Sequence, residues 1–87
     1  MKHRQINYTP QFLKSLKHLP KDQLNHLSEK EKIFLKDPYD PRLKTHKLSG
    51  KLRKFYAFSV SYHWRIVFHF VGEDIYFDNI GTHEVYK

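Results

Sequence analysis

The sequence predicts an α+β fold with two layers, in which a helical hairpin packs on one face of an antiparallel sheet. Apolar residues recur at helical spacing through the first half of the chain, and apolar and polar residues alternate through the second half. The expected order of elements is strand, helix, helix, strand, strand, strand (β-α-α-β-β-β). With 87 residues and no repeat or linker, the chain is expected to form one small domain over residues 1–87.

The first half is expected to form a short strand and two helices. Residues 2–8 alternate as a strand does, while Thr9 supplies a helix N-cap and Pro10 a favoured first helical residue. Pro20 ends this helix, and a second helix is expected over residues 21–36. The side chains predicted to be buried are Phe12, Leu13, Leu16 and Leu19 on the first helix and Leu24, Leu27, Phe34 and Leu35 on the second.

The second half is expected to form a connector and three strands. Two prolines in residues 37–41 end the second helix, and residues 42–54 follow as a basic connector. Strands are expected at residues 55–62, 63–71 and 75–80, paired as an antiparallel meander. Alternation along the middle strand places Trp64, Ile66, Phe68 and Phe70 on one face and Arg65, Val67 and His69 on the other.

Positive charge gathers in the connector and the strands that follow it. The formal net charge is +7, and no acidic residue lies between Asp40 and Glu73. This balance favours a nucleic acid, an anionic lipid or an acidic protein as partner, and the aromatic side chains in the same stretch suit flat bases. The side chains predicted to contact RNA are Lys47, Lys51, Arg53, Lys54 and His63.

Composition also bounds the setting in which the chain works. No apolar run approaches the ~20 residues of a membrane span, so no membrane contact is expected. The chain has no cysteine, which fits a reducing cytoplasm and removes thiolate metal sites. No pair of the seven histidines has the spacing of a helical zinc motif, so neither a metal nor another cofactor is predicted.

Three segments of the chain resemble a known family. They are HKLSG at residues 46–50, WRIVF at residues 64–68 and IGTHEVYK at residues 80–87. Together with the helical hairpin before them, they are similar to the RelE/ParE superfamily of type II toxin–antitoxin toxins, and most of all to its RelE and YafQ branches. The resemblance implies a metal-independent endoribonuclease that cuts mRNA in the ribosomal A site and is neutralised by a small acidic antitoxin.

The same resemblance implies a set of catalytic side chains. His46 matches the histidine before LxG in the YafQ branch, and His83 matches the histidine of the GTH tail. Arg65 matches an arginine of RelE that contacts phosphate, and Tyr86 matches a closing aromatic residue. Histidine suits proton transfer at neutral pH, and arginine suits a phosphate with developing charge. Which histidine acts as base stays open, as does whether Arg65 instead pairs with Asp78 or Glu73 across the sheet.

The chain also departs from both branches. The lysine pair of RelE aligns with Tyr56 and Phe58, and the YafQ histidine on the same strand aligns with Ser59. His63 stands where YafQ has an aspartate, and Asn79 stands where it has an arginine. Two alternatives therefore remain beside the ribonuclease: a ParE-like inhibitor of DNA gyrase, and an inactive module that binds RNA or an antitoxin.

Overall fold

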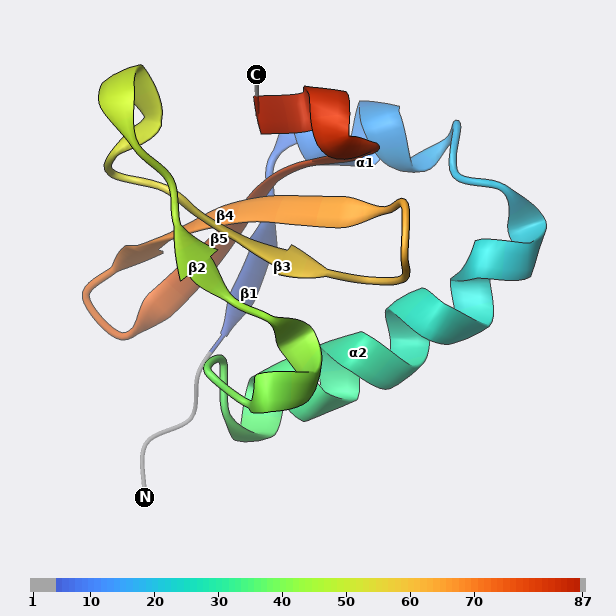
Figure 1. Ribbon diagram of the computed structural model, residues 1–87, viewed down its shortest axis with the longest axis horizontal. Helices are drawn as coiled ribbons and strands as arrows, with labels where there is room; N and C mark the ends of the chain where they lie inside the picture. Colours follow the sequence, from blue (N-terminus) through green and yellow to red (C-terminus); the bar gives the residue numbers. More distant parts are fainter. Residues whose placement is uncertain (1–4, 87) are drawn as a thin grey trace.

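The computed structural model describes residues 5–86, apart from the side chain of Tyr86, and its fold confirms the predicted α+β class (Figure 1). The strands are β1 (Ile6–Tyr8), β2 (His46–Lys47), β3 (Tyr56–Ser59), β4 (Arg65–Val71) and β5 (Asp74–Gly81). The α-helices are α1 (Pro10–Leu16) and α2 (Leu24–Lys36). Single turns of 3-10 helix are η1 (Lys21–Gln23), η2 (Pro41–Leu43), η3 (Gly50–Leu52) and η4 (His83–Tyr86).

The sheet has the order β1-β5-β4-β3-β2. The meander of β3, β4 and β5 is antiparallel, as predicted. The sheet as a whole is mixed, because β1 pairs in parallel with β5. A parallel pair needs a long crossover, and the two helices and the meander between these strands supply one. The part of the first predicted strand at residues 2–4 lies outside the described residues.

The helical face of the sheet carries the main core. Phe34 of α2 is fully buried there, and its ring lies 4.8 Å from that of Phe58, 4.9 Å from that of Phe68 and 5.4 Å from that of Phe77. Phe12 of α1 is also buried against Phe77. Three leucines expected in the buried stripes are about half exposed instead: Leu13, Leu24 and Leu35.

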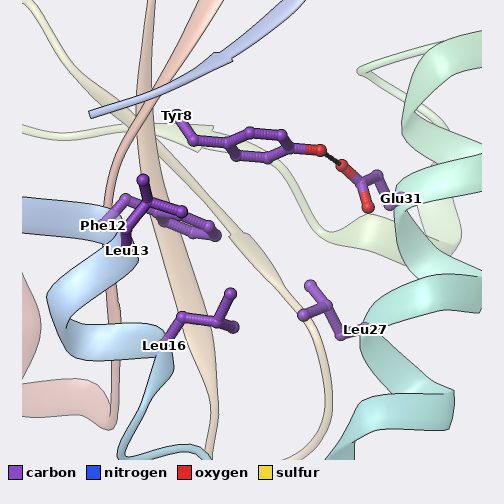
Figure 2. A pocket seen from close by; sticks show the side chains of 6 residues that line it. All are labelled: Tyr8, Phe12, Leu13, Leu16, Leu27 and Glu31. Carbon is purple, nitrogen blue, oxygen red and sulfur yellow. Dashed lines mark hydrogen bonds between the residues drawn. The ribbon is translucent and has the colours of Figure 1, made fainter. Parts of the chain in front are cut away.

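A shallow apolar groove lies between the two helices beside β1 (Figure 2). It has a volume of about 110 Å³ and is lined by Tyr8, Phe12, Leu13, Leu16, Leu27 and Glu31. The Tyr8 hydroxyl donates a hydrogen bond to the Glu31 carboxylate across its rim. Leu13 lines this groove and remains about half exposed.

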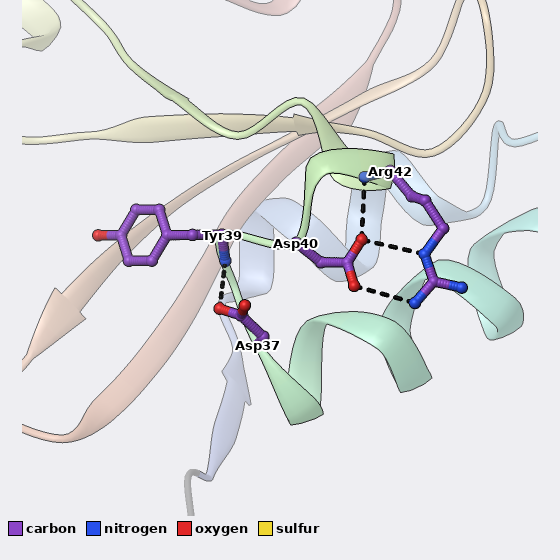
Figure 3. A network of polar contacts seen from close by, with 4 residues as sticks. All are labelled: Asp37, Tyr39, Asp40 and Arg42. Carbon is purple, nitrogen blue, oxygen red and sulfur yellow. Dashed lines mark hydrogen bonds and ion pairs between the residues drawn. The ribbon is translucent and has the colours of Figure 1, made fainter.

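The turn after α2 is fixed by its own acidic side chains (Figure 3). Asp37 accepts a hydrogen bond from the backbone N–H of Tyr39 at 2.9 Å. Asp40 accepts three bonds from Arg42, from its backbone N–H, Nε and Nη2, at 2.9 to 3.0 Å. The contacts of Asp40 cap η2, and the chain then enters β2, an edge strand within the stretch that was predicted to be only a connector.

The face opposite the helices carries a second, smaller core. Leu48, Ala57 and Val67 are buried there, and Leu52, Phe55 and Val85 pack against them. The η3 segment and the C-terminal turn thus cover part of the face on which the sequence predicted no helix. Figure 1 shows both on the side of the sheet away from α2. No helix within residues 5–86 is long and apolar enough to cross a membrane.

Candidate active site

A cleft of about 430 Å³ opens where β4 begins and β5 ends. The register pairs Arg65 with Gly81, so the loop before β4 and the turn after β5 meet at the same edge. The cleft is lined by Tyr62, His63, Arg65, Thr82, His83 and Glu84. The structure therefore brings together three side chains of the predicted site, Arg65, His63 and His83.

Arg65 holds the loop between β3 and β4 in place. Its Nη1 donates hydrogen bonds to the carbonyls of Ser61 at 2.7 Å, Tyr62 at 2.9 Å and Trp64 at 3.2 Å. The predicted alternative, an ion pair with Asp78, is wrong, because Asp78 bonds to His69 instead. A guanidinium that is fixed through one nitrogen keeps its orientation, which is what a phosphate contact requires.

Arg65 also borders a second cleft of about 280 Å³. This cleft is lined by Lys30, Lys44, Ser59, Ser61, Tyr62 and Arg65. Lys30 comes from α2, and its Nζ donates to the carbonyl of Val60 at 3.1 Å. Sequence reasoning singled out neither Lys30 nor Lys44. A usable signal existed for Lys30, because it stands three residues after Leu27 and four before Phe34, on the inward stripe.

Two exposed rings stand at the mouth of the first cleft. The ring of Tyr62, which is 85% exposed, lies 4.8 Å from that of His63 and nearly perpendicular to it. The strand predicted over residues 55–62 ends early, at Ser59, because the loop closes on itself through a 2.9 Å bond from Val60 N–H to the carbonyl of Trp64. This turn places Tyr62 and His63 at the cleft, and sequence reasoning missed Tyr62.

The C-terminal turn supplies His83. Its side chain is exposed and lines the first cleft together with Glu84. The turn lies so close to the end of β5 that a Cβ atom at Gly81 would stand 3.1 Å from the Cβ of Val85. Tyr86 belongs to the same turn, η4, but its side chain lies outside the described part of the chain.

His46 lies on the same face of the sheet as Arg65, outside the first cleft. It pairs with Ala57, and Ala57 pairs with Val67, two residues from Arg65 on β4. With about 4.8 Å between strands and 3.3 Å per residue, the Cα atoms of His46 and Arg65 are roughly 12 Å apart. The Nδ1 of His46 is 3.2 Å from the carbonyl oxygen of Lys44, the residue that lines the second cleft.

The predicted RNA-binding cations divide between the two faces. Lys51, Arg53 and Lys54 are exposed around η3, on the face that carries Arg65. Lys47 pairs with Tyr56, whose ring packs on Phe68 in the main core, so Lys47 belongs to the helical face. A period-two strand forces this split, because neighbouring residues of β2 point to opposite faces.

His69 and Asp78 form a pair further along this face. Their Nδ1 and Oδ2 atoms are 2.7 Å apart, and the His69 ring stacks on that of Tyr76. Burial raises the pKa of the Asp78 carboxyl, although its hydrogen bond to His69 works in the opposite direction. Within residues 5–86, no three His, Asp or Glu side chains converge as metal ligands, and the metal-free site stays a prediction.

Three solved structures are similar to this chain. The first is YafQ from E. coli strain BL21(DE3), with a TM-score of 0.78 and 22% identity over 93% of this chain and 94% of that one. The second is the E. coli DinJ–YafQ toxin–antitoxin complex, with a TM-score of 0.77 and 22% identity over 95% of this chain and 96% of that one. The third is the YoeB dimer from Staphylococcus aureus, with a TM-score of 0.72 and 19% identity over 94% of this chain and 99% of that one. This chain has the YafQ fold. The predicted resemblance to the RelE/YafQ toxins is thereby confirmed at the level of the fold. No family model and no curated protein matches the sequence.

Proposed function

We propose that this chain is the toxin of a type II toxin–antitoxin system and that it cuts mRNA in the ribosomal A site. The observation that carries the proposal is the cleft in which Arg65 meets His63 and His83. A fixed guanidinium beside imidazoles on a cationic surface is suited to a phosphodiester, because phosphate binding and proton transfer are needed at one point. The fold, shared with YafQ and YoeB, supports the same reaction class.

The proposed step is an internal transfer that needs no metal. A neutral imidazole removes the proton of the ribose 2′-OH, and the 2′-oxygen forms a bond to the adjacent phosphorus. The bond from phosphorus to the 5′-oxygen breaks, and an imidazolium gives that oxygen its proton. The products are a 2′,3′-cyclic phosphate and a 5′-hydroxyl, so atoms and charge balance.

The structure supports a division of these roles around Arg65. Arg65 borders both clefts, so it is assigned to the reacting phosphate. His83 lies on one side of it, and His46, next to Lys44, lies on the other. We assign these two histidines to the acid–base pair and His63 to a contact with the phosphate. Tyr86 is assigned to stacking on a base.

An acidic antitoxin is the proposed protein partner. The E. coli complex shows YafQ bound to its antitoxin DinJ. The present chain has a net charge of +7, and a free mRNA-cutting toxin would stop the growth of its own cell. A partner with opposite charge would cover the cationic face and block the cleft. In this proposal both proteins act in the cytoplasm.

The test uses purified protein with mRNA-programmed ribosomes and maps the cut ends. We expect A-site cleavage by the wild type. The cleavage rate should fall by roughly a hundredfold or more in His83→Ala and Arg65→Ala. It should fall much less in Lys51→Ala, which removes only a flanking phosphate contact. His26→Ala is the matched control for histidine, since His26 is exposed on α2. Equal small losses for Arg65→Ala and Lys51→Ala would remove Arg65 from the site.

The two alternatives give different results in the same preparation. A ParE-like inhibitor would produce gyrase-dependent DNA breaks and leave the mRNA intact. An inactive module would leave both intact, and expression of wild type and His83→Ala in cells would be equally harmless. Either outcome would end the ribonuclease proposal.

A further inference from the structure

A row of rings crosses the face of the sheet opposite the helices, away from the cleft described above. The ring of Phe55 lies 5.4 Å from that of His69 and nearly perpendicular to it. The ring of His69 lies 5.3 Å from that of Tyr76 and stacks on it with planes 19° apart. These rings come from the segment before β3, from β4 and from β5, so the sheet fixes their spacing. None of them has a part in the proposed cleavage step.

A groove of about 210 Å³ runs beside this row. It is lined by Leu52, Phe55, Val67, Asp78, Asn79 and Val85. Its floor is apolar, and its polar side is formed by Asp78 and Asn79. One oxygen of Asp78 is bonded to Nδ1 of His69, which fixes the carboxylate at the edge of the groove. An apolar slot with a fixed acceptor on one side matches a flat ring that carries an amino group.

Cations surround the groove on the side of η3. Along residues 51–55 the apolar side chains Leu52 and Phe55 pack inward, whereas Lys51, Arg53 and Lys54 are exposed. The same short segment therefore offers a ring contact on the side of the sheet and three positive charges on the side of the solvent. This combination suits single-stranded nucleic acid, in which bases alternate with phosphates along the chain. A neutral or cationic partner would gain nothing from the three charges.

The groove adjoins the cleft through the C-terminal turn. Val85 of η4 lines the groove, and His83 of the same turn lines the cleft. His69 stands four residues after Arg65 on β4, which is roughly 13 Å along the strand. A short stretch of extended RNA held at Arg65 would therefore reach the groove without leaving the sheet.

We propose that this groove is a base-binding subsite for a nucleotide that flanks the cleaved bond. The base enters against Phe55 and Val67, and the carboxylate of Asp78 accepts a hydrogen bond from its exocyclic amino group. The exposed cations of residues 51–54 hold the adjoining phosphates. The subsite selects bases that carry an exocyclic amino group, such as cytosine and adenine, over uracil, which carries none. The proposal rests on the proposed function, because it names the RNA that the same protein would cut.

The first test measures binding in the absence of ribosomes and chemistry. Short 2′-O-methyl RNA strands of only C, only A or only U cannot undergo internal attack, and their affinities are measured by fluorescence anisotropy. We expect the wild type to bind C and A strands roughly tenfold more tightly than U, and Asp78→Asn to lose this preference. Asp74→Asn, an exposed carboxylate at the start of β5, is the matched control and keeps it. Equal affinity of the wild type for all three strands, or no binding, overturns the subsite.

The second test removes the ring without emptying the small core. Phe55→Leu keeps an apolar side chain in place, and it should weaken binding of every strand by roughly tenfold through the loss of one stacking contact. Phe70→Leu is the matched control, because Phe70 packs on the helical face. Unfolding by heat shows whether each variant is folded. Wild-type affinity in a folded Phe55→Leu protein overturns the subsite.

The outcomes separate this proposal from the cleavage proposal. Selective binding without mRNA cleavage on ribosomes leaves the groove as a base-binding site, but it ends the ribonuclease proposal and with it the placement of that base beside a cleaved bond. Cleavage together with unselective binding, weakened by Lys51→Ala but not by Asp78→Asn, leaves the ribonuclease and overturns the subsite. That second result would mean that this face holds only the phosphate backbone.

Discussion

A single methyl group at Gly81 tests whether the C-terminal turn positions the chemistry. The structure leaves 3.1 Å between a Cβ atom at this position and the Cβ of Val85, and 3.3 Å to its Cγ2. Ordinary carbon contacts are about 3.5–4.0 Å. In Gly81→Ala the turn must therefore move outward by roughly half an ångström, and His83 moves with it because it lies between the two residues.

The expected effect is on activity more than on stability. A misplacement of about 1 Å can cost roughly a hundredfold in rate, so half of that predicts about a tenfold slower cleavage. The backbone of Gly81 does not have a positive φ, and loss of a glycine stiffens the unfolded chain, which favours folding by about 0.4–1 kcal/mol. These gains offset part of the strain at Val85, so the unfolding free energy should change little.

Gly72→Ala is the matched control in the turn between β4 and β5. Nothing lies within 4 Å of a Cβ atom at this position, but the φ of +61° strains any side chain. The unfolding free energy of this variant should therefore fall by about 1 kcal/mol, while its mRNA cleavage stays normal. The assay is single-turnover mRNA cleavage on ribosomes, with thermal unfolding in parallel. Wild-type cleavage by a folded Gly81→Ala protein would refute the argument that this turn positions His83.

Three further predictions concern stability. Phe34→Ala should cost about 3–5 kcal/mol in chemical denaturation, because it empties the centre of the main core, and a loss below 1 kcal/mol would mean that α2 repacks. Partial burial and the hydrogen bond to Glu31 raise the pKa of Tyr8 to about 12. The phenol therefore ionises at lower pH in the unfolded chain than in the folded one, so the unfolding free energy should fall between about pH 10 and 12. Tyr8→Phe should remove that fall. The hydrogen bonds from Arg42 lower the pKa of Asp40 to about 2, so the contribution of Asp40 should be complete above its ordinary pKa and be lost on acidification towards pH 2. A thermal midpoint of Asp40→Asn with the same acid dependence as the wild type would contradict this.

The fold was predictable because its main elements follow strong periodic patterns. Thr9 caps α1 through its hydroxyl, and Pro10 begins the helix, as the sequence indicated. The second core was not predictable in the same way. Leu48 and Leu52 stand in a connector without any period, and Val85 stands in the C-terminal tail, so only the folded sheet shows that they meet on one face. A local pattern cannot report a contact between segments that are distant in sequence.

The site residues likewise divide into those whose position follows from a local pattern and those whose position depends on the folded chain. Alternation along β4 correctly placed Arg65 on the face opposite Ile66 and Phe68, because a strand has a strict period of two. The position of Tyr62 depends on a loop that begins where β3 was expected to continue. Lys44 depends on a left-handed backbone with φ of 54° after η2, which no property of lysine indicates.

The departures from the RelE pattern have a structural consequence. Phe58, which aligns with one lysine of RelE, is fully buried under α2, so a cation at this position would be desolvated. Under the proposed function, cations for the phosphate must therefore come from other elements. Lys30 from α2 and Lys44 from the turn after η2 stand around the cleft that Arg65 borders, where Ser59 faces it across the strand pair. In the proposed reaction the positive charge would thus come from three separate segments, and cleavage would depend on their packing as much as on the residues themselves.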